Sequence, residues 1–281
     1  MLELFTHHWA DLTTRHCADL AAHPDVASVV AILPVAATEQ HGPHLPLSVD
    51  TLLVEGVIAA ALPHLGGTPA LFMPTQAISL STEHTQFAGT LSLSPQTVIA
   101  LWMEIGACVA RSGIKKLVLL NSHGGNVGLM DVVARELRSA HGLIVYHTSW
   151  YNLPLLDAGT GEDLNTLFSK HEHRFGVHAG EIETSMMLAL RPDLVAMHLA
   201  ENFHSTSEDR AKEYPILGNG KSAKLGWQMQ DYNAAGAAGN ATAATAAKGQ
   251  ALLDSAGLQL AQLLAEISRL PLSTLASKPS A

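Results

Sequence analysis

Short apolar runs of strand length alternate along this chain with longer segments of helical periodicity. We expect strands at 27–35, 69–73, 115–120 and 143–147, and helices at 49–63, 95–111, 127–140, 180–190 and 241–265. Strands that are apolar throughout are typical of parallel sheets buried on both faces. The alternation therefore predicts an α/β fold, in which helices cover both faces of a mainly parallel sheet in a three-layer αβα arrangement.

The chain reads as one domain with a short tail. Its 281 residues are 47% hydrophobic, enough to bury a sizeable core, and no Pro/Ser linker, charge block or repeat divides them. We predict a single domain over 1–268 and a frayed C-terminal tail at 269–281, where Pro and Ser accumulate. Two long irregular segments, 150–177 and 200–233, are typical of functional lids or interface arms.

Charge and composition narrow the functional classes. The net charge of −9 argues against nucleic-acid binding, which requires a basic face. We see no apolar run near the length of about 20 residues that crosses a bilayer, and the first residues lack the pattern of a signal peptide. Cys17 and Cys108 do not suggest a disulfide framework. We therefore expect a cytoplasmic protein.

The segment that follows the first expected strand carries potential metal ligands. Glu39 and His41 are two residues apart, so both point to one side of an extended backbone. A turn rich in Gly and Pro then allows Asp50 to fold back toward them. This donor set suits zinc, manganese or iron(II). A polar loop that happens to contain a histidine explains the segment equally well when it is considered alone.

A second polar cluster follows another apolar strand. Residues 121–126, Asn-Ser-His-Gly-Gly-Asn, come directly after the strand at 115–120. Ligands of open α/β sheets bind outside the carboxyl ends of the strands, which is where His123 is expected to lie. A glycine turn between strand and helix would explain Gly124 and Gly125, but not the flanking histidine and asparagines.

A third cluster, His-Ala-Gly-Glu-Ile-Glu-Thr-Ser at 178–185, opens a helix. Glu181 and Glu183 cannot both face one side of a helix, so one is expected to reach a metal while the other caps or hydrogen-bonds. Acidic residues are also favoured at any helix N-terminus. That explanation fits Glu181 better than Glu183.

These clusters together resemble the creatininase (creatinine amidohydrolase) family. The resemblance covers about residues 25–265 and rests on the segments 38–51, 83–90, 121–126, 178–185 and 241–249. It implies a metal-dependent amidohydrolase that uses a metal-activated water to cleave a non-peptide C–N bond in a small cyclic amide or formamide. Creatinine amidohydrolase proper, a peptide-trimming hydrolase of redox-cofactor maturation, other family hydrolases such as a deformylase, and a non-catalytic metal-binding paralogue remain alternatives.

The resemblance also implies a dinuclear site for two divalent ions, zinc and/or manganese, or iron. It gives one ion to Glu39, Asp50 and His123, and the other to His41 with Asp50 as the bridging residue. Where creatininase supplies a further glutamate, this chain has Gly125, so Glu183 is expected to replace that ligand. This departure argues against creatinine as the substrate.

The remaining expectations concern proton transfer, substrate and assembly. His178 is favoured as the general acid that protonates the leaving nitrogen. The alternative is that His178 only orients Glu183. Glu183 is itself expected to be a catalytic residue. Glu83 and His84 are expected to support the site. The partner is a small-molecule amide, and the resemblance implies a homo-oligomer, a hexamer. Expected substrate contacts are Ser81, Gly124, Gly125 and Trp150, and Trp227 is a further candidate.

Overall fold

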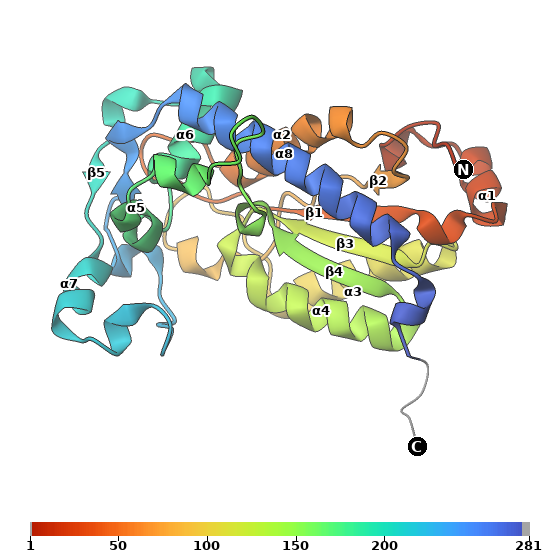
Figure 1. Ribbon diagram of the computed structural model, residues 1–281. Helices are drawn as coiled ribbons and strands as arrows, with labels where there is room; N and C mark the ends of the chain where they lie inside the picture. Colours follow the sequence, from red (N-terminus) through yellow and green to blue (C-terminus); the bar gives the residue numbers. More distant parts are fainter. Residues whose placement is uncertain (1, 277–281) are drawn as a thin grey trace.

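A parallel four-stranded sheet forms the centre of the computed structural model, which describes residues 2–276 (Figure 1). The strands are β1 (Val30–Val35), β2 (Ala70–Phe72), β3 (Lys116–Asn121) and β4 (Ile144–Ser149), in the order β2-β1-β3-β4. All three strand pairs are parallel. The predicted mainly parallel sheet is confirmed, and the central pair, β1 and β3, ends side by side.

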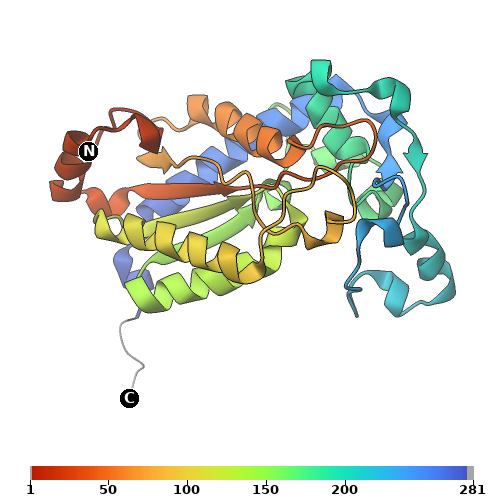
Figure 2. The ribbon, with the colours of Figure 1, turned by 180° about the vertical axis from the view of Figure 1, so that it is seen from behind.

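Helices cover both faces of this sheet, which confirms the three-layer arrangement (Figures 1 and 2). One face packs against α2 (Val49–Ala61), α6 (Glu181–Leu190) and α8 (Ala246–Arg269), and the other against α3 (Pro95–Arg111) and α4 (Val127–His141). Alternate residues of β1 and β3 enter the two separate cores because successive side chains of a strand point to opposite faces. Among residues 2–276, no helix combines the length and apolarity needed to cross a membrane.

Several short elements were not expected from the sequence. They are α1 (Thr14–Ala22), α5 (Lys170–Phe175), α7 (Thr206–Glu213) and the antiparallel pair β5 (Asn202–Phe203) and β6 (Gly239–Asn240). The side chains of Thr13, Ser169 and Ser205 cap α1, α5 and α7. Side-chain caps stabilise helices that are too short to show a clear apolar period in the sequence. The two segments predicted to be irregular, 150–177 and 200–233, therefore contain the short helices α5 and α7.

The end of the chain also differs from the expected outline. The helices expected at 241–265 are a 3-10 turn followed by the single helix α8, which continues to Arg269. A second 3-10 turn then spans Leu272–Thr274, and Arg138 donates a hydrogen bond to the carbonyl oxygen of Ala276. The last part of the predicted tail, 277–281, lies outside the described residues.

Candidate metal centre

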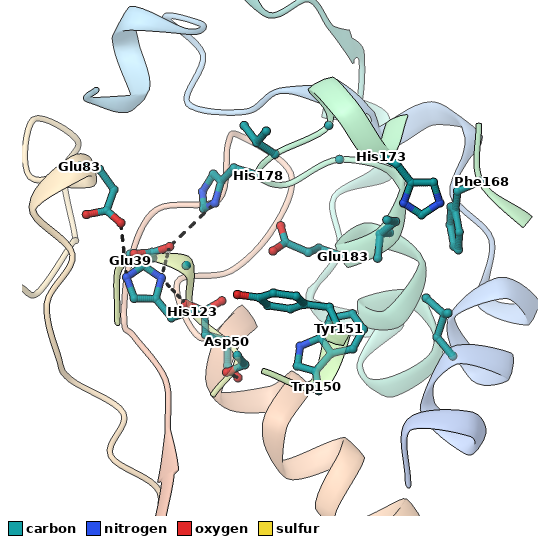
Figure 3. A pocket seen from close by; sticks show the side chains of 18 of the residues that line it. Glu39, Asp50, Glu83, His123, Trp150, Tyr151, Phe168, His173, His178 and Glu183 are labelled. Carbon is teal, nitrogen blue, oxygen red and sulfur yellow. Dashed lines mark hydrogen bonds and ion pairs between the residues drawn. The ribbon is translucent and has the colours of Figure 1, made fainter. Parts of the chain in front are cut away.

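The three polar clusters meet beyond the carboxyl ends of β1 and β3. Val35 and Asn121, the last residues of these neighbouring strands, are paired in register, which brings the loop after β1 beside the loop after β3. The first turn of α2 supplies Asp50 and the start of α6 supplies Glu183 (Figure 3). The carboxyl ends of neighbouring parallel strands lie together, so side chains from four segments of the chain meet at this edge of the sheet.

The predicted ligands form two overlapping groups. His123 Nδ1 lies 3.2 Å from Glu39 Oε1 and 3.3 Å from Asp50 Oδ2, and His41 Nε2 lies 3.5 Å from Asp50 Oδ1. Ligand atoms of Glu39, Asp50 and His123 all lie within 4.8 Å of one another, as do those of His41, Asp50 and Glu183. Asp50 belongs to both groups. A third group of the same kind joins Glu39 and His41 to His178.

Two buried atoms at the centre of this arrangement lack a hydrogen bond. His41 Nε2 and Asp50 Oδ2 are inaccessible to solvent and make none with any described residue. Such atoms are rare in folded proteins because leaving them unsatisfied is costly. Carboxylate oxygens and imidazole nitrogens that face one another without hydrogen bonds are well satisfied by a divalent cation, so these residues fit a metal.

Backbone carbonyls fix the orientation of both candidate histidine ligands. His123 Nε2 lies 2.8 Å from the carbonyl oxygen of Leu80, and His41 Nδ1 lies 3.1 Å from that of Glu39. A ring nitrogen that donates to a carbonyl carries the proton, which leaves the opposite nitrogen as an electron-pair donor. His123 Nδ1 and His41 Nε2 are therefore the nitrogens that face the carboxylates.

Charges in the cluster shift the titration of its members. Burial alone would raise the pKa of Glu39, but the neighbouring His123 lowers it to about 2. Burial likewise opposes ionisation of Asp50, whose pKa His123 and His41 lower to about 2. Burial would lower the pKa of His41, yet the contact with Asp50 raises it to about 9. The pKa of Glu183 rises to about 7 because the carboxyl group is buried.

The two glutamates of α6 have different surroundings. Glu181 is paired with the ammonium group of Lys248, whereas Glu183 points toward the cluster (Figure 3) and accepts a 2.5 Å hydrogen bond from the amide of Ala179. Ala179 has a positive φ of 54°, unusual for a residue with a side chain. The geometry favours Glu183 over Glu181 as the residue that can bind a metal.

A buried glutamate missed in the sequence holds this third cluster in place. Glu172 of α5 accepts hydrogen bonds from the backbone amides of Glu181 (2.7 Å) and Asn240 (2.9 Å). A Cβ atom at Gly176, Gly180 or Gly239 would collide with its carboxylate, so the glycines provide the space that it occupies. Glu172 lies in a segment expected to be irregular, and only the local abundance of glycine could have indicated its role.

His178 lies between the cluster and a second buried histidine. Its Nε2 lies 2.7 Å from the carbonyl oxygen of Gln40, and its Nδ1 lies 3.9 Å from Glu39 Oε1. Burial and the nearby His41 hold the pKa of His178 well below its usual value. The imidazole is thus neutral, with Nε2 donating to Gln40 and Nδ1 facing the carboxylate of Glu39. His84, centred 4.2 Å from His178, lies 3.4 Å from the same carboxylate.

A cavity of about 410 Å³ opens beside the cluster, within the size range of small-molecule sites. Of the expected substrate contacts, Gly124, Gly125 and Trp150 line it. Ser81 is fully buried and donates a 2.5 Å hydrogen bond to Glu39 Oε2, so its contact in this structure is with a candidate ligand. Tyr151, which the sequence gave no reason to select, extends toward the cluster in Figure 3.

The environment of Gly125 explains why no side chain is present there. A Cβ atom at this position would lie 2.4 Å from both Glu83 Oε1 and His123 Nε2. The carboxylate of Glu83, 3.6 Å from His123 Nε2, occupies the space that a side chain at 125 would need. Burial raises the pKa of Glu83.

Comparison with known proteins supports a relationship over nearly the whole chain. The family model described as creatininase, creatinine amidohydrolase, matches residues 11–264. A mycofactocin precursor peptide peptidase of Mycobacterium ulcerans is 33% identical over 58% of this chain and 59% of its own length. A creatinine amidohydrolase of Pseudomonas putida is 34% identical over 59% of this chain and 66% of its own length. These matches span about two thirds or less of either relative.

Solved structures support the same relationship. A structure described as creatininase Mn superposes with a TM-score of 0.70 and 28% identity, over 93% of this chain and 98% of the other. A mutant creatininase described as the Zn-Zn type gives a TM-score of 0.70 and 26% identity over the same shares.

Proposed function

This chain belongs to the creatininase family, and on that premise we propose that it is a metal-dependent amidohydrolase that cleaves a non-peptide C–N bond in a small cyclic amide or formamide. The observation that carries the proposal is a pair of buried atoms without hydrogen bonds, His41 Nε2 and Asp50 Oδ2, at the centre of a cluster of carboxylates and imidazoles. A cavity of ligand size adjoins that cluster, so a substrate amide can reach it.

The proposed ligands hold two divalent ions, zinc and/or manganese, with iron as a further candidate. Glu39, Asp50 and His123 would hold one ion, and His41, Asp50 and Glu183 the other, with Asp50 shared. When bound, the ions supply a water of lowered pKa and polarise the amide carbonyl. Structures described as Zn-Zn and Mn forms of creatininase support this choice of metals.

The chain's own groups then move the protons. Glu183, which lies beside His41 and Asp50 in the cluster, would accept a proton from the attacking water. His178 Nε2 donates a hydrogen bond to the Gln40 carbonyl, which leaves Nδ1 free to take up a proton released by the attacking water and to pass it to the leaving nitrogen. Trp150, Gly124 and Gly125 line the cavity, where they would contact the amide.

Creatinine itself fits this site poorly. The carboxylate that creatininase places two residues beyond the equivalent of His123 is absent, and Glu83 fills the space beside Gly125. A peptide-trimming activity is the second candidate, favoured by the identity to the mycofactocin precursor peptide peptidase. Every predicted type of ligand is present apart from the carboxylate missing at Gly125, which argues against a non-catalytic paralogue. We also propose that the protein acts on small-molecule amides in the cytoplasm, as a homo-oligomer that is a hexamer by family resemblance.

The proposal is tested with protein stripped by a chelator and reloaded with zinc or manganese. Elemental analysis should give two ions per chain, and the loaded protein should hydrolyse at least one cyclic amide or formamide. Creatinine should be turned over with kcat/KM below about 10⁴ M⁻¹s⁻¹, the lower end of ordinary enzymes. Inactivity toward all amides by a fully loaded protein, or efficient creatinine hydrolysis, would contradict the proposal.

A further inference from the structure

Tyr151 is a polar residue of the cavity without a role in the chemistry proposed above. It lines the cavity and is 40% exposed, and its hydroxyl is directed toward the cluster of Glu39, Asp50 and His123 (Figure 3). The ring and the hydroxyl therefore offer a surface to a bound ligand. Building on the proposed amidohydrolase function, we propose that Tyr151 is a catalytic residue whose hydroxyl donates a hydrogen bond to the amide oxygen when negative charge develops there.

The position of Tyr151 is fixed by its neighbours. It belongs to a 3-10 turn, Trp150–Asn152, that directly follows β4. The Trp150 side chain is 3% exposed, and the Tyr151 ring packs edge-on against it with the ring centroids 5.5 Å apart. An anchored ring holds its hydroxyl in place before the substrate binds, and electrostatic stabilisation of a developing charge depends on donors that are oriented in advance.

The hydroxyl carries a proton that it can donate at neutral pH. Partial burial and the nearby carboxylates of Asp50 and Glu183 raise the pKa of Tyr151, although Ser149 and His123 oppose this shift. Asp50 and His123 belong to one group of candidate ligands, and Asp50 and Glu183 to the other, so the phenol lies within electrostatic reach of both groups. A neutral phenol there can donate to an oxygen that is bound between them.

Other side-chain donors beside the cluster are already engaged. The Nε2 atoms of His123 and His178 face backbone carbonyl oxygens, and Ser122 Oγ donates a 2.6 Å hydrogen bond to the carbonyl oxygen of Asp50. The candidate ligands themselves contribute carboxylate oxygens, which accept hydrogen bonds and would repel an oxyanion. The Tyr151 hydroxyl is a donor that faces the cluster from the cavity and can be reached by the substrate.

The proposed contact involves no transfer of the Tyr151 proton. The attacking water forms the new C–O bond, and an electron pair of the C=O double bond moves onto the amide oxygen, to which Tyr151 donates. The C=O bond then forms again as the C–N bond breaks, and the leaving nitrogen takes the proton that His178 carries. Because the oxygen is negatively charged only between these steps, the hydrogen bond should raise kcat rather than lower KM.

A conservative substitution tests this role in turnover. Tyr151→Phe removes the hydroxyl and keeps the ring. With the amide that the zinc-loaded wild-type protein hydrolyses fastest, kcat should fall by at least about 100-fold, while KM should stay within about twofold of the wild-type value. Zinc content should not change, because the phenol is proposed as a hydrogen-bond donor and not as a ligand. An effect confined to KM, or loss of zinc, would overturn the inference.

Tyr146 provides a matched control. It lies in β4, is 42% exposed and is not among the residues that line the cavity. Tyr146→Phe should therefore leave kcat, KM and zinc content unchanged. A fall of kcat in Tyr146→Phe as large as that in Tyr151→Phe would contradict a specific role of the Tyr151 hydroxyl.

Binding of a tetrahedral anion tests the contact without turnover. Methylphosphonate resembles the tetrahedral intermediate of amide hydrolysis, and calorimetry measures its dissociation constant for the zinc-loaded proteins. Tyr151→Phe should weaken binding by at least about tenfold, and Tyr146→Phe should not. Equal affinity of Tyr151→Phe and wild type, or no binding by wild type, would overturn the inference. The predicted loss of affinity in a protein that hydrolyses no amide would support the contact of Tyr151 and contradict the amidohydrolase proposal alone.

Discussion

His123, which follows β3, and Asp50, in the first turn of α2, approach to 3.3 Å between Nδ1 and Oδ2. The opposite ring nitrogen of His123 is held by the Leu80 carbonyl, so the imidazole cannot turn away from the carboxylate without losing that bond. Asp50 also faces His41 from its other oxygen. A carboxylate whose two oxygens face two oriented imidazoles is well placed to act as a bridging metal ligand.

The shared position of Asp50 predicts a large effect of its removal. Asp50→Ala should lose most bound metal and all measurable turnover, because both proposed ions lose a ligand. Glu83→Ala, which removes a nearby carboxylate outside both ligand groups, should retain at least about three quarters of the wild-type metal, as expected for a residue beyond the coordinating set. Elemental analysis after dialysis decides the comparison. Wild-type metal content in Asp50→Ala would refute the bridging assignment.

Metal binding should release protons. In the absence of metal, the contact with Asp50 raises the pKa of His41 to about 9, and burial raises that of Glu183 to about 7, so a metal must displace protons from both groups. Lower pH favours the protonated, metal-free form, and the affinity should therefore fall as pH falls from 9 to 6. Burial lowers the pKa of His123, but the carboxylates of Glu39 and Asp50 raise it well above its usual value. Calorimetry at pH 7 in buffers of different ionisation enthalpy should therefore report release of about two to three protons per chain. A buffer-independent enthalpy would contradict this account.

Glycines 125 and 124 offer a comparison between adjacent positions. Gly125→Ala should destabilise the fold by about 1–3 kcal/mol, since its Cβ would press on Glu83 and His123. Gly124→Ala meets nothing within 4 Å and should change the free energy of unfolding by less than about 0.5 kcal/mol. Denaturant unfolding of both metal-free variants provides the measurement. Equal destabilisation at the two positions would show that crowding by Glu83 is not the reason for Gly125.

Glu172 should affect the metal centre from a distance. Glu172→Ala leaves the amides of Glu181 and Asn240 without their acceptor, and we expect a loss of about 2–4 kcal/mol in unfolding free energy. Metal affinity should also weaken, because the start of α6 positions Glu183. Glu162→Ala, at an exposed position, serves as the control for both readouts. Unchanged metal affinity in Glu172→Ala would remove its positioning role.

The sequence was sufficient for the sheet and for the convergence of Glu39 and His123. Both follow apolar strands, and the carboxyl ends of neighbouring parallel strands lie together whatever their separation along the chain. The sequence favoured Glu183 over Glu181 as the ligand, but it gave no sign of the pairing of Glu181 with Lys248, which arrives from α8. Ser81 contacts Glu39, and three glycines surround Glu172, only because the fold brings distant segments together. No local sequence pattern indicates either contact.

The most direct test of the central claim is anomalous diffraction from crystals of the zinc-loaded protein. We expect two peaks on either side of Asp50, one with Glu39 and His123 and the other with His41 and Glu183, at ligand distances of about 2.0–2.3 Å. A peak coordinated by Glu181 instead of Glu183, or no zinc within this cluster in a protein that retains zinc elsewhere, would contradict it.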